Sequence, residues 1–208
     1  MAIDFYTFNT PNGRKISVAL EEMGLPYTVK TIDITKDQQF DPAFLAISPN
    51  NKIPAIVDPD GPGGAPISVF ESGAILLYLA EKTGRFMPHD LRARVPVLEW
   101  LMFQVGGFGP MPGQVHHFLT VENEQDRRYG LARFSKETER LYGVMDRRLA
   151  DHAFFAGDIS IADFAMIGWA WRHERHRIDL ARFPHVKRWY ETMMARPGVA
   201  KGFSVTLS

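Results

Sequence analysis

Hydrophobic and polar positions divide the chain into two parts with different periodicities. In the first part, short β-prone runs alternate with segments whose apolar residues recur every three or four positions. The order strand, helix, strand at the start is typical of a parallel pair with a helical crossover, and the last two strands flank a Pro/Gly-rich turn that favours an antiparallel hairpin. The pattern predicts strands over residues 3–8, 27–34, 53–57 and 66–70, and helices from about 16 to Gly24, over 41–47 and over 72–82, the last closed by Gly84.

Strand signals disappear in the second part, and the pattern there predicts only helices. The expected helices span residues 95–105, 124–150, 164–171 and 184–196, with a Gly-rich interruption at 106–110 and a short tail at the end. In the longest helix, Leu131, Phe134, Leu141, Met145 and Leu149 share one face. We therefore expect an α/β domain over residues 1–84 and an all-helical domain over residues 85–208.

Charge and composition exclude several classes of protein. The 24 basic and 24 acidic residues cancel, which argues against a nucleic-acid partner, since such binding depends on an excess of Lys and Arg. No apolar run approaches the ~18 residues of a membrane span, and the start of the chain does not read as a signal peptide. We expect a cytoplasmic protein with neither nucleic-acid nor membrane partners.

The chain contains no cysteine. Disulfide bridges, cysteine metal ligands and a thiol nucleophile supplied by the protein are therefore excluded. His173 and His176 share a helix face, but no third ligand accompanies them, so we expect no metal site.

Four local motifs carry a resemblance to a known family: TPNGRK at residues 10–15, SPNNKIPA at 48–55, FESGAI at 70–75 and SIADF at 160–164. With these motifs in this order, the chain resembles the cytosolic glutathione transferases, and in particular the nu class. That class includes bacterial disulfide-reducing enzymes and is related to the transferase-like domain of the yeast prion nitrogen regulator. The resemblance implies a thioredoxin-like N-terminal domain, an all-helical C-terminal domain, a homodimer and glutathione, reduced or oxidised, as cofactor.

The resemblance assigns the glutathione-binding residues. It implies that the bond between Ile53 and Pro54 is cis and that the backbone of Ile53 pairs with glutathione as with an added strand. A plain trans proline that opens a strand is the alternative. Ser72 would bind the γ-glutamyl carboxylate at a helix N-terminus and Glu71 the ammonium, whereas a simple serine N-cap is the commoner use of such a residue.

Three further positions are assigned by the resemblance alone. Gln39 and Lys52 match residues that contact glutathione in the nu class, and Arg133 matches an arginine that reaches the cofactor from the helical domain. The guanidinium fork suits a carboxylate, although Arg133 could equally be a solvated helix charge.

The turn at Thr10 and Asn12 is the candidate catalytic centre. Because no protein thiol exists here, the reacting sulfur must belong to the bound cofactor. A thiol of pKa ~8.5 is only about 3% thiolate at pH 7, and lowering that pKa by ~2 units requires about 2.7 kcal/mol, within reach of two or three hydrogen-bond donors. Both residues could instead only shape a turn. Tyr6 lies in mid-strand, where we expect a core or interface role.

The resulting functional hypothesis is an enzyme that reduces disulfides with glutathione. Conjugation of glutathione to small electrophiles is an alternative within the same class, with thiols, disulfides or electrophiles as substrates in either case. A non-enzymatic glutathione-binding regulator is the alternative of another class. Ser160–Asp163 is a capping box, which we assign to folding.

Overall fold

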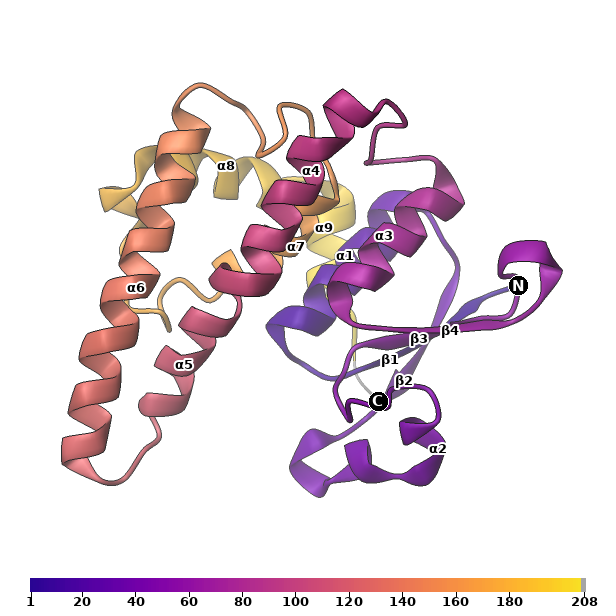
Figure 1. Cartoon of the computed structure of the whole chain (residues 1–208), viewed down its shortest axis with the longest axis horizontal. Helices are drawn as coiled ribbons and strands as arrows, with labels where there is room; N and C mark the ends of the chain where they lie inside the picture. The colour runs from indigo at the N-terminus through magenta and orange to yellow at the C-terminus, as the bar shows by residue number, and fades with distance from the viewer. Residues whose placement is uncertain (207–208) are drawn as a thin grey trace. The chain divides into compact units, whose positions relative to one another are not determined.

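The computed structural model describes residues 1–206 and forms two compact units, each described here by itself (Figure 1). The first unit comprises Met1–Met87 together with the C-terminal segment from Met194, and the second comprises Pro88–Met193. The domain bounds predicted from the sequence, 1–84 and 85–208, do not assign the segment from Met194 onward to the first unit. The expected fold class, an α/β part followed by an all-helical part, is confirmed.

A mixed four-stranded sheet with the order β2-β1-β3-β4 lies at the centre of the first unit. β1 pairs in parallel with β2 and antiparallel with β3, which forms the expected antiparallel pair with β4. β3 begins two residues later than predicted, because Pro54 has no N–H to donate to a strand ladder. The strands are β1 (Ile3–Thr7), β2 (Tyr27–Thr31), β3 (Ala55–Asp58) and β4 (Ile67–Phe70).

Helices α1 (Pro11–Met23) and α3 (Ser72–Thr83) pack against each other and supply most of the first unit's helical core. Both end as predicted at a glycine in the left-handed region, Gly24 with φ 68° and Gly84 with φ 63°. The short helix α2 (Pro42–Leu45) buries Phe44. β2 ends at Thr31, earlier than predicted, and 3₁₀ turns fill the stretch before α2, at η1 (Ile34–Lys36) and η2 (Gln38–Phe40).

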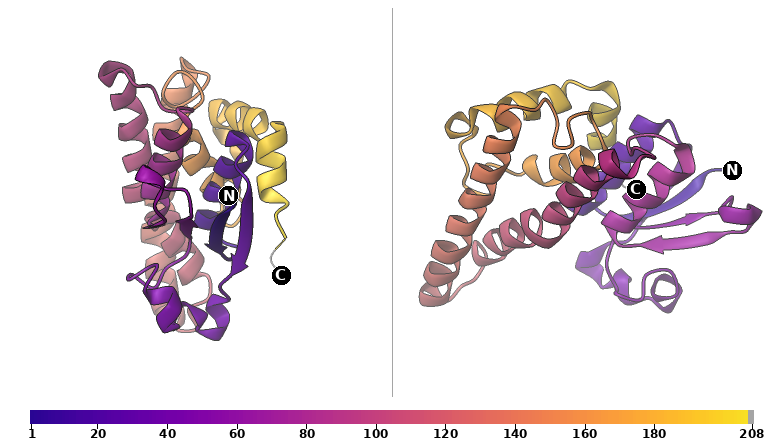
Figure 2. Two further views of the ribbon diagram at one scale, coloured as in Figure 1. Left: turned by 90° about the vertical axis from the view of Figure 1, so that its right-hand side faces the viewer. Right: turned by 45° about the horizontal axis from the view of Figure 1, so that its top comes forward.

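The tail predicted after residue 196 is wrong, because a further helix, α9 (Pro197–Phe203), forms there and packs against α1. Figure 2 shows this yellow helix beside the indigo one. The approach is close at Gly202, where an added Cβ would lie 2.6 Å from Cα of Val18. The Ser17 hydroxyl donates to the Gly202 carbonyl at 2.8 Å, and Arg196 pairs with Glu22 at 2.6 Å.

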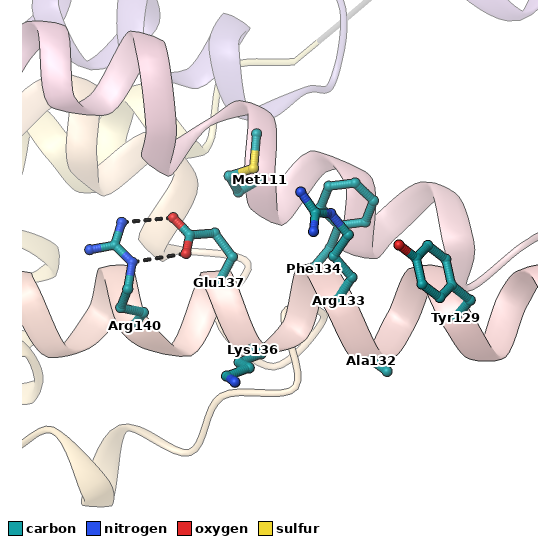
Figure 3. A pocket seen from close by; sticks show the side chains of 8 residues that line it. All are labelled: Met111, Tyr129, Ala132, Arg133, Phe134, Lys136, Glu137 and Arg140. Carbon is teal, nitrogen blue, oxygen red and sulfur yellow. Dashed lines mark hydrogen bonds and ion pairs between the residues drawn. The ribbon is translucent and has the colours of Figure 1, made fainter.

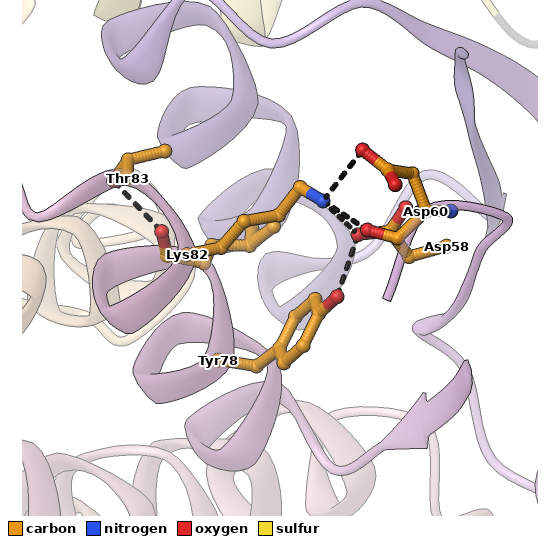
Figure 4. A network of polar contacts seen from close by, with 6 residues as sticks. Asp58, Asp60, Tyr78, Lys82 and Thr83 are labelled. Atoms are coloured by element: carbon orange, nitrogen blue, oxygen red, sulfur yellow. Dashed lines mark hydrogen bonds and ion pairs between the residues drawn. The ribbon is translucent and has the colours of Figure 1, made fainter. Parts of the chain in front are cut away.

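A buried carboxylate fixes the end of β3 against α3 (Figure 4). Asp58 is only 1% exposed, and it accepts hydrogen bonds from the Tyr78 hydroxyl at 2.6 Å and from the backbone N–H of Asp60 at 2.9 Å. Lys82 forms an ion pair with the same carboxylate at 2.9 Å. Because Tyr78 and Lys82 both belong to α3, this network fixes that helix, whose first residue is Ser72, on the sheet.

The described part of the second unit is helical, as predicted. The helix α6 has the expected bounds, and Leu141, Met145 and Leu149 on its predicted face are buried. The Gly-rich interruption is instead the π-helical turn η4, from which the chain runs into α5, a helix that the sequence pattern did not predict. The elements are α4 (Leu91–Phe103), η4 (Gln104–Phe108), α5 (Pro110–Phe118), α6 (Glu124–Ala150), α7 (Ile161–Ala170), the 3₁₀ turn η5 (Leu180–Arg182) and α8 (Pro184–Met194).

The capping box predicted at the start of α7 is confirmed. The Ser160 hydroxyl accepts from the backbone N–H of Ala162 at 3.3 Å, and the Asp163 carboxylate accepts from the backbone N–H of Ser160 at 3.0 Å. Asp163 is fully buried and also accepts from the indole N–H of Trp189 at 2.9 Å. The motif therefore anchors α8 on α7, a structural role.

Candidate functional site

A polar pocket of about 220 Å³ lies in the first unit, where three segments meet. These are the N-terminal turn of α1, the loop before β3 and the turn from β4 into α3. The pocket is lined by Asn12, Ser48, Asn50, Lys52, Ile53, Pro54, Phe70, Glu71 and Ser72. Most of the residues singled out in the sequence thus lie around one cavity.

The α1 turn is shaped by Thr10, which is the N-cap of the helix. Its side-chain oxygen accepts a hydrogen bond from the backbone N–H of Gly13 at 3.2 Å, and Pro11 occupies the first helical position. A Cβ at Gly13 would lie 2.4 Å from Oγ1 of Thr7, so only glycine fits this turn. Asn12 follows in the first turn, half-buried, and lines the pocket.

The loop before β3 supplies the second wall. The peptide bond between Ile53 and Pro54 is cis, as the resemblance implies. The buried hydroxyl of Ser48 donates to the carbonyl of Lys52 at 2.8 Å and closes the loop on itself. The loop is thereby held as a compact turn with Lys52 exposed at the pocket.

Glu71 and Ser72 form the third wall at the start of α3. Glu71 is the N-cap and has φ 68°, a conformation that non-glycine residues adopt mainly where the surrounding structure enforces it, often at functional sites. Its carboxylate accepts from the side-chain amide of Asn50 at 3.2 Å. Ser72 is the first residue of a 12-residue helix, so its hydroxyl lies at the positive end of the helix dipole. The pair offers an acceptor for a cation beside a donor for an anion.

Sequence reasoning gave no role to Lys15, which the structure places directly behind this wall. Its ammonium lies 3.1 Å from Oγ of Ser72, and the residue is only 2% exposed. Burial lowers the pKa of Lys15 to about 7, although the negative charge of Glu71 opposes the shift. Its place on the same helix face as Ala19 follows from the sequence, but its burial is seen only in the structure, where residues 13–20 are buried throughout.

Four sequence candidates lie outside the pocket lining: Thr10, at the N-cap of α1, and Gln39, Tyr6 and Arg133. Gln39 belongs to η2, where its amide donates to Asp37 at 3.4 Å. Tyr6 lies half-buried in β1 with its ring 6.1 Å from that of Phe44. Arg133 belongs to the second unit, exposed on α6.

Arg133 borders a separate cavity of about 610 Å³ on the second unit (Figure 3). Arg140 binds Glu137 there through two hydrogen bonds at 2.7 and 2.8 Å. Arg133 and Lys136 add further positive charge, and Met111, Ala132 and Phe134 supply apolar surface. The lining residues are Met111, Tyr129, Ala132, Arg133, Phe134, Lys136, Glu137 and Arg140.

The described residues also bear on metal centres and membrane-spanning helices. Between residues 1 and 206, no group of three His, Cys, Asp or Glu side chains is placed to hold a metal ion. No helix in that same range is long and apolar enough to cross a membrane.

Two family models and several known proteins match this chain. Residues 10–82 match the glutathione S-transferase N-terminal domain, and residues 108–197 match the C-terminal domain. The disulfide-bond oxidoreductase YfcG of Escherichia coli is 51% identical over 201 residues, which cover 96% of this chain and 93% of YfcG. The disulfide-bond oxidoreductase YghU of the same organism is 38% identical, over 96% of this chain and 73% of YghU.

Solved structures also show similarity to glutathione transferases. A glutathione transferase from Pseudomonas putida, with one glutathione disulfide bound per subunit, superposes with a TM-score of 0.91 at 42% identity, covering 98% of this chain and 91% of that one. Ure2p in complex with glutathione superposes with a TM-score of 0.87 at 30% identity, covering 97% of each chain. The chain therefore belongs to the glutathione S-transferase family and is similar within it to YfcG and Ure2p.

Proposed function

We propose that the protein is a glutathione-dependent disulfide-bond oxidoreductase in which the sulfur of bound glutathione carries the exchange. The observation that carries the proposal is a polar pocket of about 220 Å³, lined by Asn12, Lys52, Glu71 and Ser72, in a chain without cysteine. The names of YfcG and YghU, both disulfide-bond oxidoreductases, support the same reaction.

In this proposal glutathione lies along the pocket of the first unit. The Ser72 hydroxyl and the N-terminus of α3 bind the γ-glutamyl carboxylate, and Glu71 binds the adjacent ammonium. The backbone of Ile53 pairs with the peptide in the middle, and the ammonium of Lys52 attracts a carboxylate. Pro54 keeps the loop in its turn. Residues 1–84 would thus bind the cofactor, and Pro88–Met193 form the helical unit.

The reacting sulfur would lie at the turn of Thr10 and Asn12. The Thr10 oxygen uses a lone pair to accept from Gly13, so its O–H hydrogen stays available for a thiolate. The side-chain amide of Asn12, which lines the pocket, is the second donor. Such donors favour the thiolate over the thiol. We retain Gln39 and Arg133 as glutathione contacts on the basis of the family resemblance.

The exchange proceeds in two balanced steps. The glutathione thiolate attacks one sulfur of a substrate disulfide, a new S–S bond forms, and the other sulfur leaves as a thiolate that takes up a proton. A second glutathione thiolate then attacks the mixed disulfide at the glutathione sulfur, which gives glutathione disulfide and the second reduced thiol. A related transferase from Pseudomonas fluorescens has two glutathione molecules bound, as these steps require.

Product stoichiometry tests the proposal. With a small organic disulfide and excess glutathione, mass spectrometry should find one glutathione disulfide for each substrate disulfide reduced, at a rate that depends on the enzyme. An enzyme that forms no glutathione disulfide above the uncatalysed rate would contradict the proposal.

Conjugation to electrophiles is the second candidate. Ure2p has been solved with S-hexylglutathione and with S-p-nitrobenzylglutathione, so a relative accommodates apolar groups on the glutathione sulfur. The same incubation with an aryl halide, analysed for the thioether adduct, distinguishes the two reactions.

We further propose that the protein is a cytoplasmic homodimer. Four apolar side chains follow one another on α4 and the adjoining π-helical turn at spacings of four, seven and three, which places them on one face. They are Leu91, Val95, Met102 and Val105, exposed by 70%, 41%, 52% and 36%. A contiguous apolar stripe of this kind favours a second copy of the chain as partner. The balanced charge argues against nucleic acid or an anionic membrane surface as partner.

A further inference from the structure

A buried lysine lies directly behind the serine that would bind the γ-glutamyl carboxylate. Lys15 and Ser72 are 2% and 6% exposed, and Nζ lies 3.1 Å from Oγ. The two residues come from different helices, α1 and α3, so the contact depends on how these helices pack. We propose that Lys15 is a positioning residue that turns the Ser72 hydroxyl toward the pocket, so that it donates to the carboxylate of glutathione. This inference rests on the proposed function.

The direction of the hydroxyl follows from donor and acceptor chemistry. A lysine ammonium can only donate, so Oγ of Ser72 must accept its hydrogen bond. The hydroxyl hydrogen then has to point elsewhere, and Ser72 lines the pocket. A neutral lysine amine has a lone pair that can accept from the hydroxyl, which would turn the hydrogen inward and remove a donor from the pocket. When Lys15 is charged, the Ser72 hydroxyl can therefore donate a hydrogen bond into the pocket. When Lys15 is neutral, it does not.

Glu71 is a counter-charge of Lys15. Its negative charge opposes the effect of burial on the pKa of Lys15. Lys52, from the loop before β3, borders the same pocket and adds like charge. Asp58 at the end of β3 is already bound to Lys82 and Tyr78.

The remaining charges of α1 are directed to other partners. The guanidinium of Arg14 donates to Asn9 and to the carbonyl groups of Gly202 and Val205. At the far end of the helix, Glu21 and Glu22 pair with Lys201 and Arg196 from the C-terminal segment. In β1, Asp4 pairs with Lys30.

Proton binding by Lys15 is thereby coupled to anion binding. Burial holds the pKa of Lys15 at about 7, and a carboxylate bound at Ser72 adds a negative charge that favours the ammonium. Glutathione should therefore bind together with a proton when the pH is above this value, and its affinity should fall as the pH rises. All seven histidines lie between residues 89 and 185, in the second unit, so none belongs to the glutathione-binding unit.

The first experiment uses the wild-type protein and S-methylglutathione, whose blocked sulfur cannot release a proton of its own. Calorimetric titrations at pH 6, 7 and 8, in two buffers with different ionisation enthalpies, measure both affinity and proton uptake. We expect affinity to fall about tenfold from pH 6 to pH 8, with proton uptake on binding at pH 8. Affinity that is flat across this range, without proton uptake, would overturn the inference.

The second experiment separates positioning from a merely structural role. Lys15→Met should weaken S-methylglutathione binding about tenfold at pH 6 and abolish the pH dependence. The matched control, Lys30→Met, removes an exposed lysine of the same unit and should leave affinity unchanged. In a Ser72→Ala background, Lys15→Met should cause no further loss.

A matched ligand completes the test. An S-methylglutathione analogue with the γ-glutamyl carboxylate converted to an amide should bind Lys15→Met and wild type equally. Equal losses for both ligands would mean that the lysine only supports the fold. If Lys15→Met does not fold, the wild-type proton uptake decides the question alone. If wild type binds no S-methylglutathione at all, the proposed function fails, and the inference fails with it.

Discussion

The side-chain oxygen of Thr10 accepts a hydrogen bond from the backbone N–H of Gly13 at 3.2 Å, so one hydroxyl both caps α1 and stands at the proposed thiolate site. A lost N-cap costs about 1 kcal/mol of stability. Substitution at Thr10 therefore combines a folding effect with any catalytic effect, and the experiment must separate the two.

Thr10→Ala and Asn12→Ala should each lower the rate of disulfide exchange about tenfold for every ~1.4 kcal/mol of thiolate stabilisation lost. Thr10→Ala should also lose about 1 kcal/mol of unfolding free energy, whereas Thr10→Ser retains the cap and most of the rate. Steady-state kinetics and urea unfolding of the three variants check this. If both alanine variants retain full activity, the activating donor lies elsewhere, and Tyr6 becomes the first candidate.

Ser72→Ala should weaken glutathione binding by about 1–3 kcal/mol, because it removes a hydrogen bond to a charged group at a buried position. Ser68→Ala is the matched control, since Ser68 lies exposed on β4 of the same unit and does not line the pocket. Isothermal calorimetry measures both variants. Equal affinity of Ser72→Ala and wild type would remove Ser72 from the binding site.

The homodimer should dissociate when charge is placed on the apolar stripe of α4. Wild type should sediment at twice the 23.6 kDa of one chain, and the double variant Leu91→Glu/Met102→Glu at 23.6 kDa. Leu119→Glu, at an apolar side chain that is 39% exposed after α5, should remain dimeric. A wild type that sediments only as a monomer at micromolar concentration would contradict the dimer.

Two stacked histidines should make the second unit sensitive to acid. The rings of His116 and His176 are 4.9 Å apart, and Nδ1 of His176 lies 3.0 Å from the Tyr142 hydroxyl. Burial, reinforced by nearby arginines, lowers the pKa of His116 to about 4. The unfolded chain binds its proton near pH 6.5, so stability is complete above that pH and falls as the pH drops toward 4.

His116→Phe keeps a stacking ring and removes the titrating group. The loss of stability between pH 7 and pH 5 should be about 1–2 kcal/mol smaller in this variant than in wild type. Urea unfolding at the two pH values measures it. An identical pH dependence in both proteins would exclude His116 as a source of acid sensitivity.

Local patterns were sufficient for most of the fold. The alternation of short strands and helices predicted the sheet elements, and Gly24 and Gly84 marked helix ends because left-handed backbone favours glycine there. α9 was missed because it is held by contacts with α1, at Ser17 and Val18. Ser17 and its partner Gly202 are 185 residues apart in the sequence, so no local pattern links them. α5 was missed because a glycine-rich segment reads as a break, although here it forms a π-helical turn.

The candidate site was only partly accessible from the sequence. The segments containing Asn12, Lys52 and Ser72 were recognised from motifs, and the fold brings them to one pocket. Lys15 received no role because a lysine in an amphipathic helix ordinarily faces solvent. Lys15 is buried beside Ser72 only because α1 packs on α3. The spacing of residues within α1 does not predict which helix will pack against it.

Paired steady-state kinetics decide whether glutathione sulfur reduces disulfides here in preference to attacking electrophiles. Wild type, Thr10→Ala and Asn12→Ala are assayed with glutathione and either a small organic disulfide or a standard aryl halide. We predict a larger kcat/KM for the disulfide, lowered in both variants. A larger kcat/KM for the aryl halide would contradict the proposed function.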